Sequence, residues 1–535
     1  MKSSLATAAL LLTYSTRSSA LASMSNIPLD TLAAHANSYA SANGIQVERR
    51  RDDDSSYFEC APMSLLPNAY PKEAFAQAQM VAPAFNELVD RVSRDADFLE
   101  ETLGGGVSDT DPFTAKILQL YKQVYGDANS PAHLADRLGI HRSDYMLHAP
   151  TEGEAYQLKQ VELNTIAASF AGLAAQIASL HRYLTSRFGG DIAEFLAINQ
   201  KIVTSSTEQA PGVPENPALS CIPLAMKVVH DRYVTNFLNG DGSNAIVLFV
   251  VQEGETNTVD QRMLEFRLFE DHGIPVTRMS LTKASKEITV DDNGALKLGE
   301  KEIAVVYYRA GYAPTDYPDG QDGIEWQARL TLETSRAAKC PSLGYHLAGT
   351  KKVQQELARP GVLERFFSTP GEKAVVESMR SCFAGLYSMG DDAVPEDLAA
   401  AQEVLDGGQG SYVLKPQREG GGYNFYGDKL AKKLRENTSK DNDGSLKLGQ
   451  KLAEYILMQR LFPPQQRAIL LRGGRVEGTG ESVSELGCYG TLVVDPNGEV
   501  VHNEYAGFLL RTKFSNVDEG GVASGFATLS SPYLC

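Results

Sequence analysis

The chain has 535 residues, of which 43% are hydrophobic and 22% charged, so it is long enough for two or more ordinary globular domains. Its net charge of −17 excludes nucleic acid as an expected partner, because no broad basic surface is present to release phosphate counterions. Nucleotides stay possible, since local lysines and Mg²⁺ can bind them. We expect no membrane partner, because beyond the N-terminus no apolar run approaches the roughly 18 residues of a membrane helix.

Residues 1–29 resemble a leader peptide. They contain no acidic residue, are rich in serine and alanine, and carry Lys2, Arg17 and a small-residue stretch at residues 20–22. This composition is typical of a signal or organelle-transit peptide, and a disordered start is the alternative. The expected location is therefore cytoplasmic or organellar, in a plastid or mitochondrion, depending on whether the leader functions.

Residues 28 to about 180 predict mainly helix. Apolar residues recur at helical spacing over residues 74–81 and 85–92. Residues 157–164 instead alternate as a strand does, which places Glu162 and Asn164 on one face.

Residues 244–350 predict a small parallel α/β domain. Apolar strands at residues 245–251 and 303–308 are separated by a helix that ends near His272. A turn at residues 291–294 is expected to join two short strands.

Residues 351–535 mix both kinds of element. We expect helices at residues 378–388, 397–405 and 449–455, and strands at residues 412–415, 456–458 and 492–494. Residues 440–445 are polar and predict an exposed insertion. No repeat of solenoid period is present. The six cysteines are scattered without a CxxC pair, which predicts neither a zinc site nor a redox dithiol.

A glycine run follows the strand at residues 412–415. Three consecutive glycines, residues 420–422, allow backbone N–H groups to approach and cradle phosphate oxygens. Lys415 adds positive charge beside them, and Glu419 offers a hard oxygen ligand for Mg²⁺. The GxxxxGK[ST] pattern of a Walker A loop is absent. Together with Glu162 and Asn164, this segment predicts nucleoside triphosphate chemistry at a magnesium site.

Seven ordered motifs resemble one family. They are VELNTIAASFAG at residues 161–172, YRAGY at 308–312, LAGTKKVQQEL at 347–357, VLKPQREGGG at 413–422, SELG at 484–487, LLRTK at 509–513 and DEGGVA at 518–523. In this order they resemble eukaryotic glutathione synthetase, and the resemblance runs from about residue 28 to 533. It implies an α/β (α+β) protein with the ATP-grasp fold. Residues 30–243 and 351–535 would form the ATP-grasp body with its glycine-rich lid, and residues 244–350 an inserted substrate-binding domain.

The resemblance implies an ATP-dependent carboxylate–amine ligase. Such an enzyme joins γ-L-glutamyl-L-cysteine to glycine through an acyl phosphate, giving glutathione, ADP and phosphate, and works as a homodimer on small-molecule substrates with Mg²⁺. Two alternatives stay open: a related ligase that uses another small amine such as β-alanine, and a nucleotide-binding relative without activity. Ala167, Ala310, the pair Gln459–Arg460 and Glu519 depart from the family pattern, but none of them removes a metal ligand or an essential lysine.

The resemblance also assigns site residues. The catalytic residues would be Arg142, Lys351 and Lys415, and the metal ligands Glu162, Asn164 and Glu419. The ATP-binding residues would be Glu162, Lys351, Lys415, Gln417, Glu419, Gly420, Gly421, Gly422, Asn424, Tyr426, Met458, Gln459, Arg460, Leu461, Glu485, Lys513 and Glu519. The residues that bind the dipeptide and glycine would be Arg142, Ile166, Ala167, Ala168, Ser169, Glu255, Gln261, Arg309, Tyr312, Arg511, Val522 and Ala523.

Overall fold

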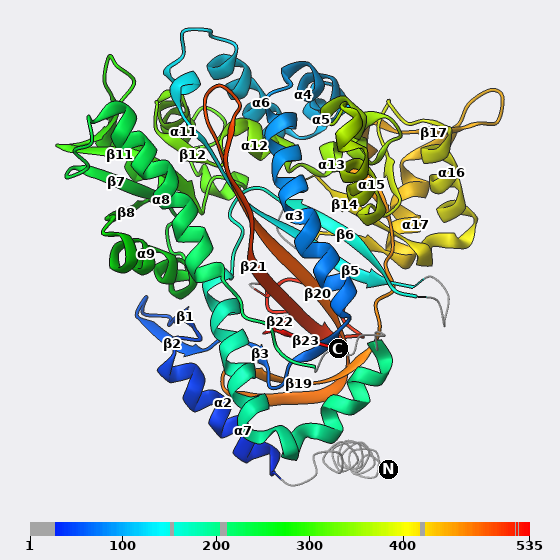
Figure 1. Cartoon of the computed structure of the whole chain (residues 1–535). Coiled ribbons are helices and arrows are strands. Elements are labelled where there is room, and N and C mark those ends of the chain that lie inside the picture. Colours follow the sequence, from blue (N-terminus) through cyan, green and yellow to red (C-terminus); the bar gives the residue numbers. More distant parts are fainter. Residues whose placement is uncertain (1–26, 150–154, 204–210, 418–422, 519, 523) are drawn as a thin grey trace.

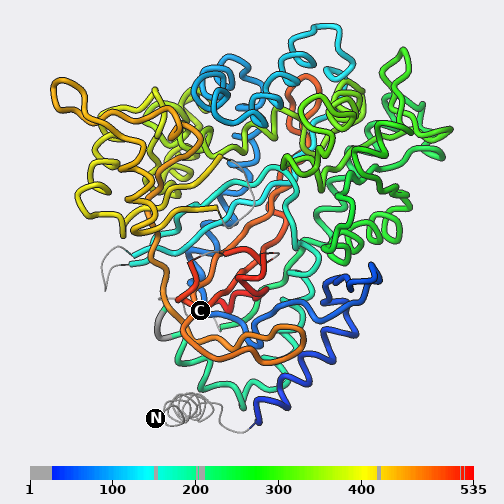
Figure 2. Tube along the Cα trace, turned by 180° about the vertical axis from the view of Figure 1, so that it is seen from behind, coloured from blue at the N-terminus to red at the C-terminus, as the bar shows by residue number. Residues whose placement is uncertain are grey.

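A large mixed sheet runs through the middle of the protein (Figure 1). The computed structural model describes residues 27–149, 155–203, 211–417, 423–518, 520–522 and 524–535. The strands β7, β8 and β11 lie toward one end of this sheet, and the segment with α16 and α17 lies at the opposite end of the molecule. The view from behind in Figure 2 shows the same separation.

Thirteen strands of the described residues form this sheet. Their order is β19-β3-β22-β21-β20-β5-β12-β11-β10-β9, while β6 pairs with β5, and β7 lies between β11 and β8. The bounds are β3 Met63–Ser64, β5 Arg137–His148, β6 Gln157–Asn164, β7 Ala245–Val250, β8 Val276–Met279, β9 Ile288–Val290, β10 Leu296–Leu298, β11 Lys301–Tyr308, β12 Ala338–Cys340, β19 Gln466–Arg472, β20 Arg475–Val494, β21 Val500–Phe514 and β22 Thr528–Ser530.

The predicted parallel strands are confirmed. β8, β7, β11 and β12 pair in parallel, and every residue of β7 is buried, as expected for a strand covered on both faces. The predicted turn joins β9 to β10, which pair antiparallel. Because Lys339 of β12 pairs with Arg137 of β5, the hydrogen bonding of this segment continues into the central sheet.

Two hydrophobic cores cover the two faces of β20 and β21. Leu486 and Leu492 pack into the core that includes α3, whereas Tyr489 and Val493 pack into the core that includes α7 and α8. The alternation follows from the two-residue period of a strand. Figure 1 shows α3 crossing in front of this hairpin.

The main helices surround the central sheet. Their bounds are α2 Leu29–Ala42, α3 Lys72–Ser93, α4 Ala96–Leu103, α6 Pro112–Tyr125, α7 Ala171–Val203, α8 Ala218–Phe237, α9 Thr258–His272, α10 Leu281–Glu287, α11 Ile324–Thr334, α12 Leu343–Ala348, α13 Lys351–Ala358, α14 Val362–Phe366, α15 Lys373–Cys382, α16 Pro395–Glu403 and α17 Gly427–Glu436. In the described part of the chain, none of the helices has the length and apolar character needed to cross a membrane.

A second sheet of four strands carries the segment around the glycine run. Its order is β13 (Leu386–Ser388), β18 (Tyr455–Gln459), β14 (Tyr412–Pro416) and β15 (Phe425–Tyr426). The strands predicted at residues 412–415 and 456–458 are confirmed. The glycine run lies in sequence between β14 and β15, and residues 418–422 lie outside the described residues.

Three secondary-structure expectations are wrong. The helix expected at residues 378–388 ends at Cys382, and β13 follows it. The helix expected at residues 449–455 is a single 3-10 turn, Gln450–Leu452, before β18. In the mainly helical N-terminal part, β5 is a twelve-residue strand whose charged residues Arg142 and Asp144 are buried, so it lacks the simple apolar alternation that would have indicated a strand.

Candidate active site

Strand register gathers the predicted polar residues on one face of the central sheet. β5 pairs with β6 so that Arg142 faces Asn164 and Asp144 faces Glu162. β5 also pairs with β20, which places Gly487 opposite Asp144. Glu485 lies two residues from Gly487 and pairs with Arg511 of β21. Because directly paired residues and residues two apart share a face, these side chains all point to the same side.

Buried ion pairs connect this cluster. Arg142 holds the Asp144 carboxylate with two parallel bonds, Nε to Oδ1 at 2.7 Å and Nη2 to Oδ2 at 2.8 Å. Arg511 Nη2 donates to the same Oδ2 at 2.8 Å and also contacts Glu485. Burial lowers the pKa of Arg142, but the adjacent Asp144 carboxylate raises it more, to above the usual range of a guanidinium. This guanidinium is therefore permanently charged.

Two lysines reach Glu162 from other elements. Lys351, the first residue of α13, donates from Nζ to Glu162 Oε2 at 2.7 Å. Lys415 of β14 donates to the carbonyl oxygen of Val161 at 3.4 Å. Burial raises the pKa of Glu162, but Lys351, Lys415 and Arg511 lower it more, to well below its usual range. Glu162 is consequently an anion at neutral pH, held between cations.

The loop before α7 carries Ser169 and is held from several sides. Ala167 and Phe170 both have positive φ, 51° and 73°, a conformation that costs free energy for residues other than glycine. Arg309 donates to Ala168 O at 2.9 Å and to Ser169 Oγ at 2.6 Å. Its Nε is buried and has no hydrogen-bond partner in the described part of the chain.

A buried carboxylate from α9 completes the support of this loop. Asp260 accepts backbone N–H groups from Phe170 at 2.7 Å, Gly172 at 2.9 Å and Leu173 at 3.2 Å. It thus caps the first turn of α7 from a neighbouring helix. Ile166 and Ala168, also predicted at the site, precede Ser169 in this segment and are buried.

A second polar group follows β7. Gln261 donates from Nε2 to Glu255 Oε2 at 2.6 Å, and Arg278 of β8 donates to Gln261 Oε1 at 2.6 Å. Both ends of the Gln261 amide are therefore fixed. Gln252, two residues after the end of β7, donates from Nε2 to the Tyr312 hydroxyl oxygen at 3.2 Å.

The residues predicted for the nucleotide lie around β14, β15 and β18. Gln459 N donates to Gly385 O and Arg460 N to Ser411 O, both at 2.8 Å, so these two amides are engaged within the protein. Gln417 Oε1 accepts from Lys352 N, whereas its Nε2 is buried without a partner among the described residues. Asn424 donates to the Tyr426 hydroxyl at 3.4 Å. Met458 is buried, and Leu461 packs against the same small core.

The last segment carries two further predicted residues, Lys513 and Val522. Lys513 Nζ donates to Asp518 O at 2.5 Å. Val522 is buried in the core that includes α7. The remaining predicted residues lie outside the described part of the chain, namely Glu419, Gly420, Gly421, Gly422, Glu519 and Ala523.

Asp144 and Asp260 were missed as site residues by sequence reasoning. The signal available for Asp144 was its spacing from Arg142, because an Arg-x-Asp pair on a strand points both side chains to one face. That signal was hidden because β5 was not recognised as a strand. Asp260 precedes the predicted Gln261, but nothing in the sequence indicates that it caps α7.

Glu162 and Asn164 suit a magnesium ion. Asn164 Nδ2 donates to Arg142 O at 3.1 Å and to Asp144 Oδ2 at 3.0 Å, which turns its amide oxygen away from both. A carboxylate and an amide oxygen on one strand face are hard donors of the kind that Mg²⁺ prefers. Within the described ranges, no group of three or more His, Cys, Asp or Glu side chains is arranged around a metal position.

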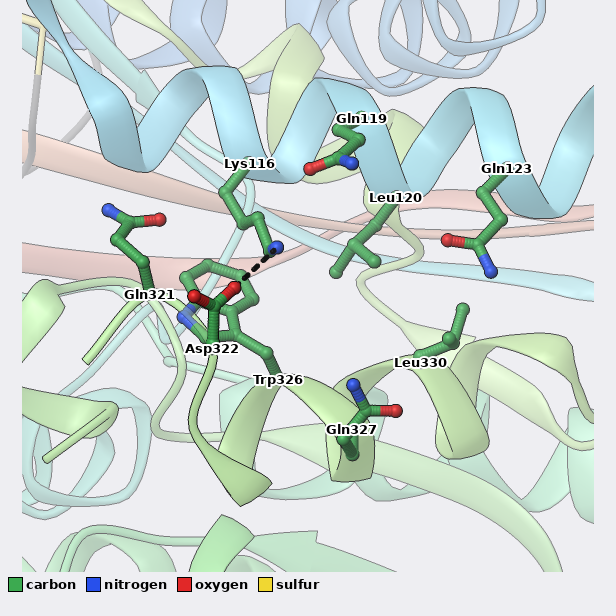
Figure 3. Close-up of a pocket in the computed structure, with 9 residues that line it drawn as sticks. All are labelled: Lys116, Gln119, Leu120, Gln123, Gln321, Asp322, Trp326, Gln327 and Leu330. Atoms are coloured by element: carbon green, nitrogen blue, oxygen red, sulfur yellow. Dashed lines mark ion pairs between the residues drawn. The ribbon is translucent and has the colours of Figure 1, made fainter. Parts of the chain in front are cut away.

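A separate cavity lies between α6 and α11 (Figure 3). Its volume is about 250 Å³, and its lining includes Lys116, Trp326 and several glutamines. Lys116 Nζ lies 4.0 Å from Asp322 Oδ1 at its edge. No residue predicted for the active site lines it, so this cavity is distinct from the charged cluster.

Fold and site together define a mixed α/β protein whose sheet carries a buried cluster of cations and carboxylates suited to anionic substrates. The family described as eukaryotic glutathione synthase, ATP binding domain, matches residues 27–534. The chain belongs to this eukaryotic glutathione synthetase family.

Individual relatives agree. The chain is 41% identical to the chloroplastic glutathione synthetase of Solanum lycopersicum over 89% of this chain and 78% of that protein. It is 38% identical to the glutathione synthetase of Homo sapiens over 94% of this chain and 97% of that protein. The fold matches a glutathione synthetase-like effector, GSS30, from Globodera pallida in its apo form, with a TM-score of 0.68, 21% identity and coverage of 94% and 96%.

Proposed function

We propose that the protein is an ATP-dependent carboxylate–amine ligase that joins γ-L-glutamyl-L-cysteine to glycine, giving glutathione, ADP and phosphate. The family match over residues 27–534 carries this proposal. It is supported by the pairing of Glu162 with Lys351 beside Arg142, which supplies the charges that phosphoryl transfer to a carboxylate requires.

The chemistry follows from the poor reactivity of a carboxylate. ATP phosphorylates the cysteinyl carboxylate, and the glycine amine then attacks the resulting acyl phosphate and releases phosphate. Lys351 and Lys415 neutralise charge on the transferring phosphoryl group. Arg142 stabilises charge at the reacting carboxylate. Glu162, Asn164 and Glu419 would hold Mg²⁺, which would offset the negative charge of the nucleotide phosphates.

We assign the dipeptide to the loop at residues 166–169 together with Glu255, Gln261, Arg309 and Tyr312. The buried, unpartnered Nε of Arg309 supports this assignment, because a guanidinium nitrogen without a partner is costly unless a ligand accepts its hydrogen bond. Arg511 also has a buried Nε without a partner among the described residues. We therefore assign Arg511 to the carboxylate of glycine, with Val522 and Ala523 beside it.

For the nucleotide we propose the residues around β14, β15 and β18. Glu485 and Lys513 join them from β20 and β21, with Glu519 after β21. Gly420, Gly421 and Gly422 would form a lid that covers the phosphates and excludes water from the acyl phosphate. The backbone N–H groups of Gln459 and Arg460 already donate hydrogen bonds within the protein. Hydrogen bonds from this segment to adenine would therefore use its other backbone groups.

The same proposal extends to domains, assembly and location. Residues 30–243 and 351–535 would form the ATP-grasp body and residues 244–350 the substrate-binding part.

A homodimer is proposed from the family resemblance, and light scattering of the purified protein tests it. Residues 1–29 would decide between cytoplasm and organelle, which fluorescent tagging of the full chain and of a form starting near Ser23 tests.

The decisive experiment measures ADP release and glutathione formation by purified protein with ATP, Mg²⁺, γ-glutamylcysteine and glycine. Turnover with β-alanine in place of glycine should be slower, and faster turnover would overturn the acceptor assignment. Absence of any product would overturn the ligase proposal. EDTA should abolish activity and added Mg²⁺ restore it. Full activity of Glu419→Ala would contradict its role as a metal ligand.

A further inference from the structure

Asp144 is a fully buried carboxylate at the centre of the charged cluster. Its Oδ1 accepts from Arg142 Nε, and its Oδ2 accepts from Arg142 Nη2, Arg511 Nη2 and Asn164 Nδ2, at distances between 2.7 and 3.0 Å. One side chain on β5 thus contacts three groups that come from three different strands. Within the described part of the chain, no other residue forms hydrogen bonds with all three of these side chains.

Each contact fixes an orientation. The two parallel bonds hold the plane of the Arg142 guanidinium, since a fork matches a carboxylate in only one arrangement. The shared Oδ2 places the Arg511 guanidinium next to that of Arg142. By accepting from Asn164 Nδ2, Asp144 also determines which end of that amide is turned outward as an oxygen donor.

The charges of the two arginines and the space beside β20 both favour a carboxylate at this position. Two guanidinium groups side by side in a buried site repel each other unless an anion lies between them. β20 leaves room for that anion because residue 487 is glycine. A Cβ atom there would lie 2.7 Å from Asp144 Oδ1 and 2.8 Å from Arg142 Cδ.

We propose that Asp144 is the positioning residue of the site: it sets Arg142 for the dipeptide, Arg511 for glycine and Asn164 for the metal without itself touching a substrate. The proposal rests on the function proposed above. It predicts that removal of the Asp144 charge disturbs binding of the two acids more than binding of ATP.

The test is Asp144→Asn, assayed as full-length purified protein with saturating Mg²⁺. The KM values for γ-glutamylcysteine and for glycine should each rise at least about tenfold and kcat should fall, while the KM for ATP changes less than about threefold. Asp90→Asn is the matched control. Asp90 of α3 is also buried, and it accepts hydrogen bonds from Arg94, from the Tyr345 hydroxyl and from Arg137. Arg137 is the first residue of β5, so this contact lies away from Arg142 and Asp144 on the same strand. This control should lose stability with all three KM values unchanged.

Two results would overturn the inference. The first is an Asp144→Asn protein in which all three KM values equal those of the wild type and only the fraction of active protein falls. Such a result would show that Asp144 has a purely structural role. If Asp144→Asn does not fold, Asp144→Glu decides, since it keeps the charge but displaces the carboxylate by one methylene. The second overturning result would be unchanged KM values for γ-glutamylcysteine and glycine in Asp144→Glu. Wild-type protein that forms no glutathione would instead refute the proposed function.

Discussion

Lys351 Nζ lies 2.7 Å from Glu162 Oε2, although the two residues are 189 positions apart in the chain. The contact joins the start of α13 to the end of β6, so it links the C-terminal segment to the central sheet. It also places the Lys351 ammonium group against the carboxylate that we assign to the metal. The same ion pair therefore holds two distant segments together and belongs to the proposed active site.

Glu162→Gln should lower the rate of ADP release at least about 100-fold, because it keeps the shape of the side chain but removes the anion among Lys351, Lys415 and Arg511. The melting temperature should fall by only a few degrees, since the side chain is partly exposed. Glu477→Gln, which removes the anion of an exposed ion pair with Arg472, is the control and should leave activity unchanged. Wild-type activity in Glu162→Gln would contradict the assignment.

Acid should destabilise the protein partly through His181 of α7. This imidazole is buried between Ser531 Oγ at 2.7 Å and Ser64 O at 2.9 Å, and burial lowers its pKa to about 4. Between pH 6.5 and 4 the unfolded chain binds a proton here that the folded protein does not. Stability is therefore lost as the pH falls through this window, by up to about 3 kcal/mol from this group.

His181→Gln should make that dependence shallower. Urea unfolding midpoints measured from pH 7 to pH 4 would show a smaller decline for the variant than for the wild type. Burial also lowers the pKa values of His141 and His346 to about 3, so part of the decline should remain. His133→Gln changes an exposed histidine and serves as the control. Equal slopes for wild type and His181→Gln would show that His181 does not contribute.

The sequence-based expectations were correct where the pattern within one segment determines the structure. They failed where the structure depends on partners from distant segments. β7 and β11 were predicted because a strand buried on both faces is a continuous apolar run. β5 was missed because its buried charges, Arg142 and Asp144, are compensated by each other and by partners on the distant strands β6 and β21. Lys351 and Glu162 were both named from the family motifs. Their contact depends on packing between distant segments, which no local pattern encodes.

Gly487→Ala should disturb the site without changing any polar group. The added methyl would lie 2.7 Å from Asp144 Oδ1 and 2.8 Å from Arg142 Cδ, so the ion pair must shift. We expect a loss of about 1–3 kcal/mol in stability and at least a tenfold loss in kcat/KM for the dipeptide. Gly478→Ala is on the same strand, and its nearest contact is an ordinary 3.5 Å from Phe514. If both variants behave alike, the close approach at Gly487 has no functional effect.

Asp260→Asn should weaken dipeptide binding from outside the site. The carboxylate accepts three backbone N–H groups at the start of α7, and an asparagine would turn an NH₂ group toward at least one of them. The buried mismatch should cost about 1–3 kcal/mol of stability and release the strained loop that carries Ser169. The KM for γ-glutamylcysteine should then rise about tenfold while the KM for ATP stays constant. Asp271→Asn on the same helix removes only an exposed contact with Arg267, so it should change neither quantity. A normal dipeptide KM in Asp260→Asn, alongside the expected loss of stability, would mean that the cap supports the fold and not the binding loop.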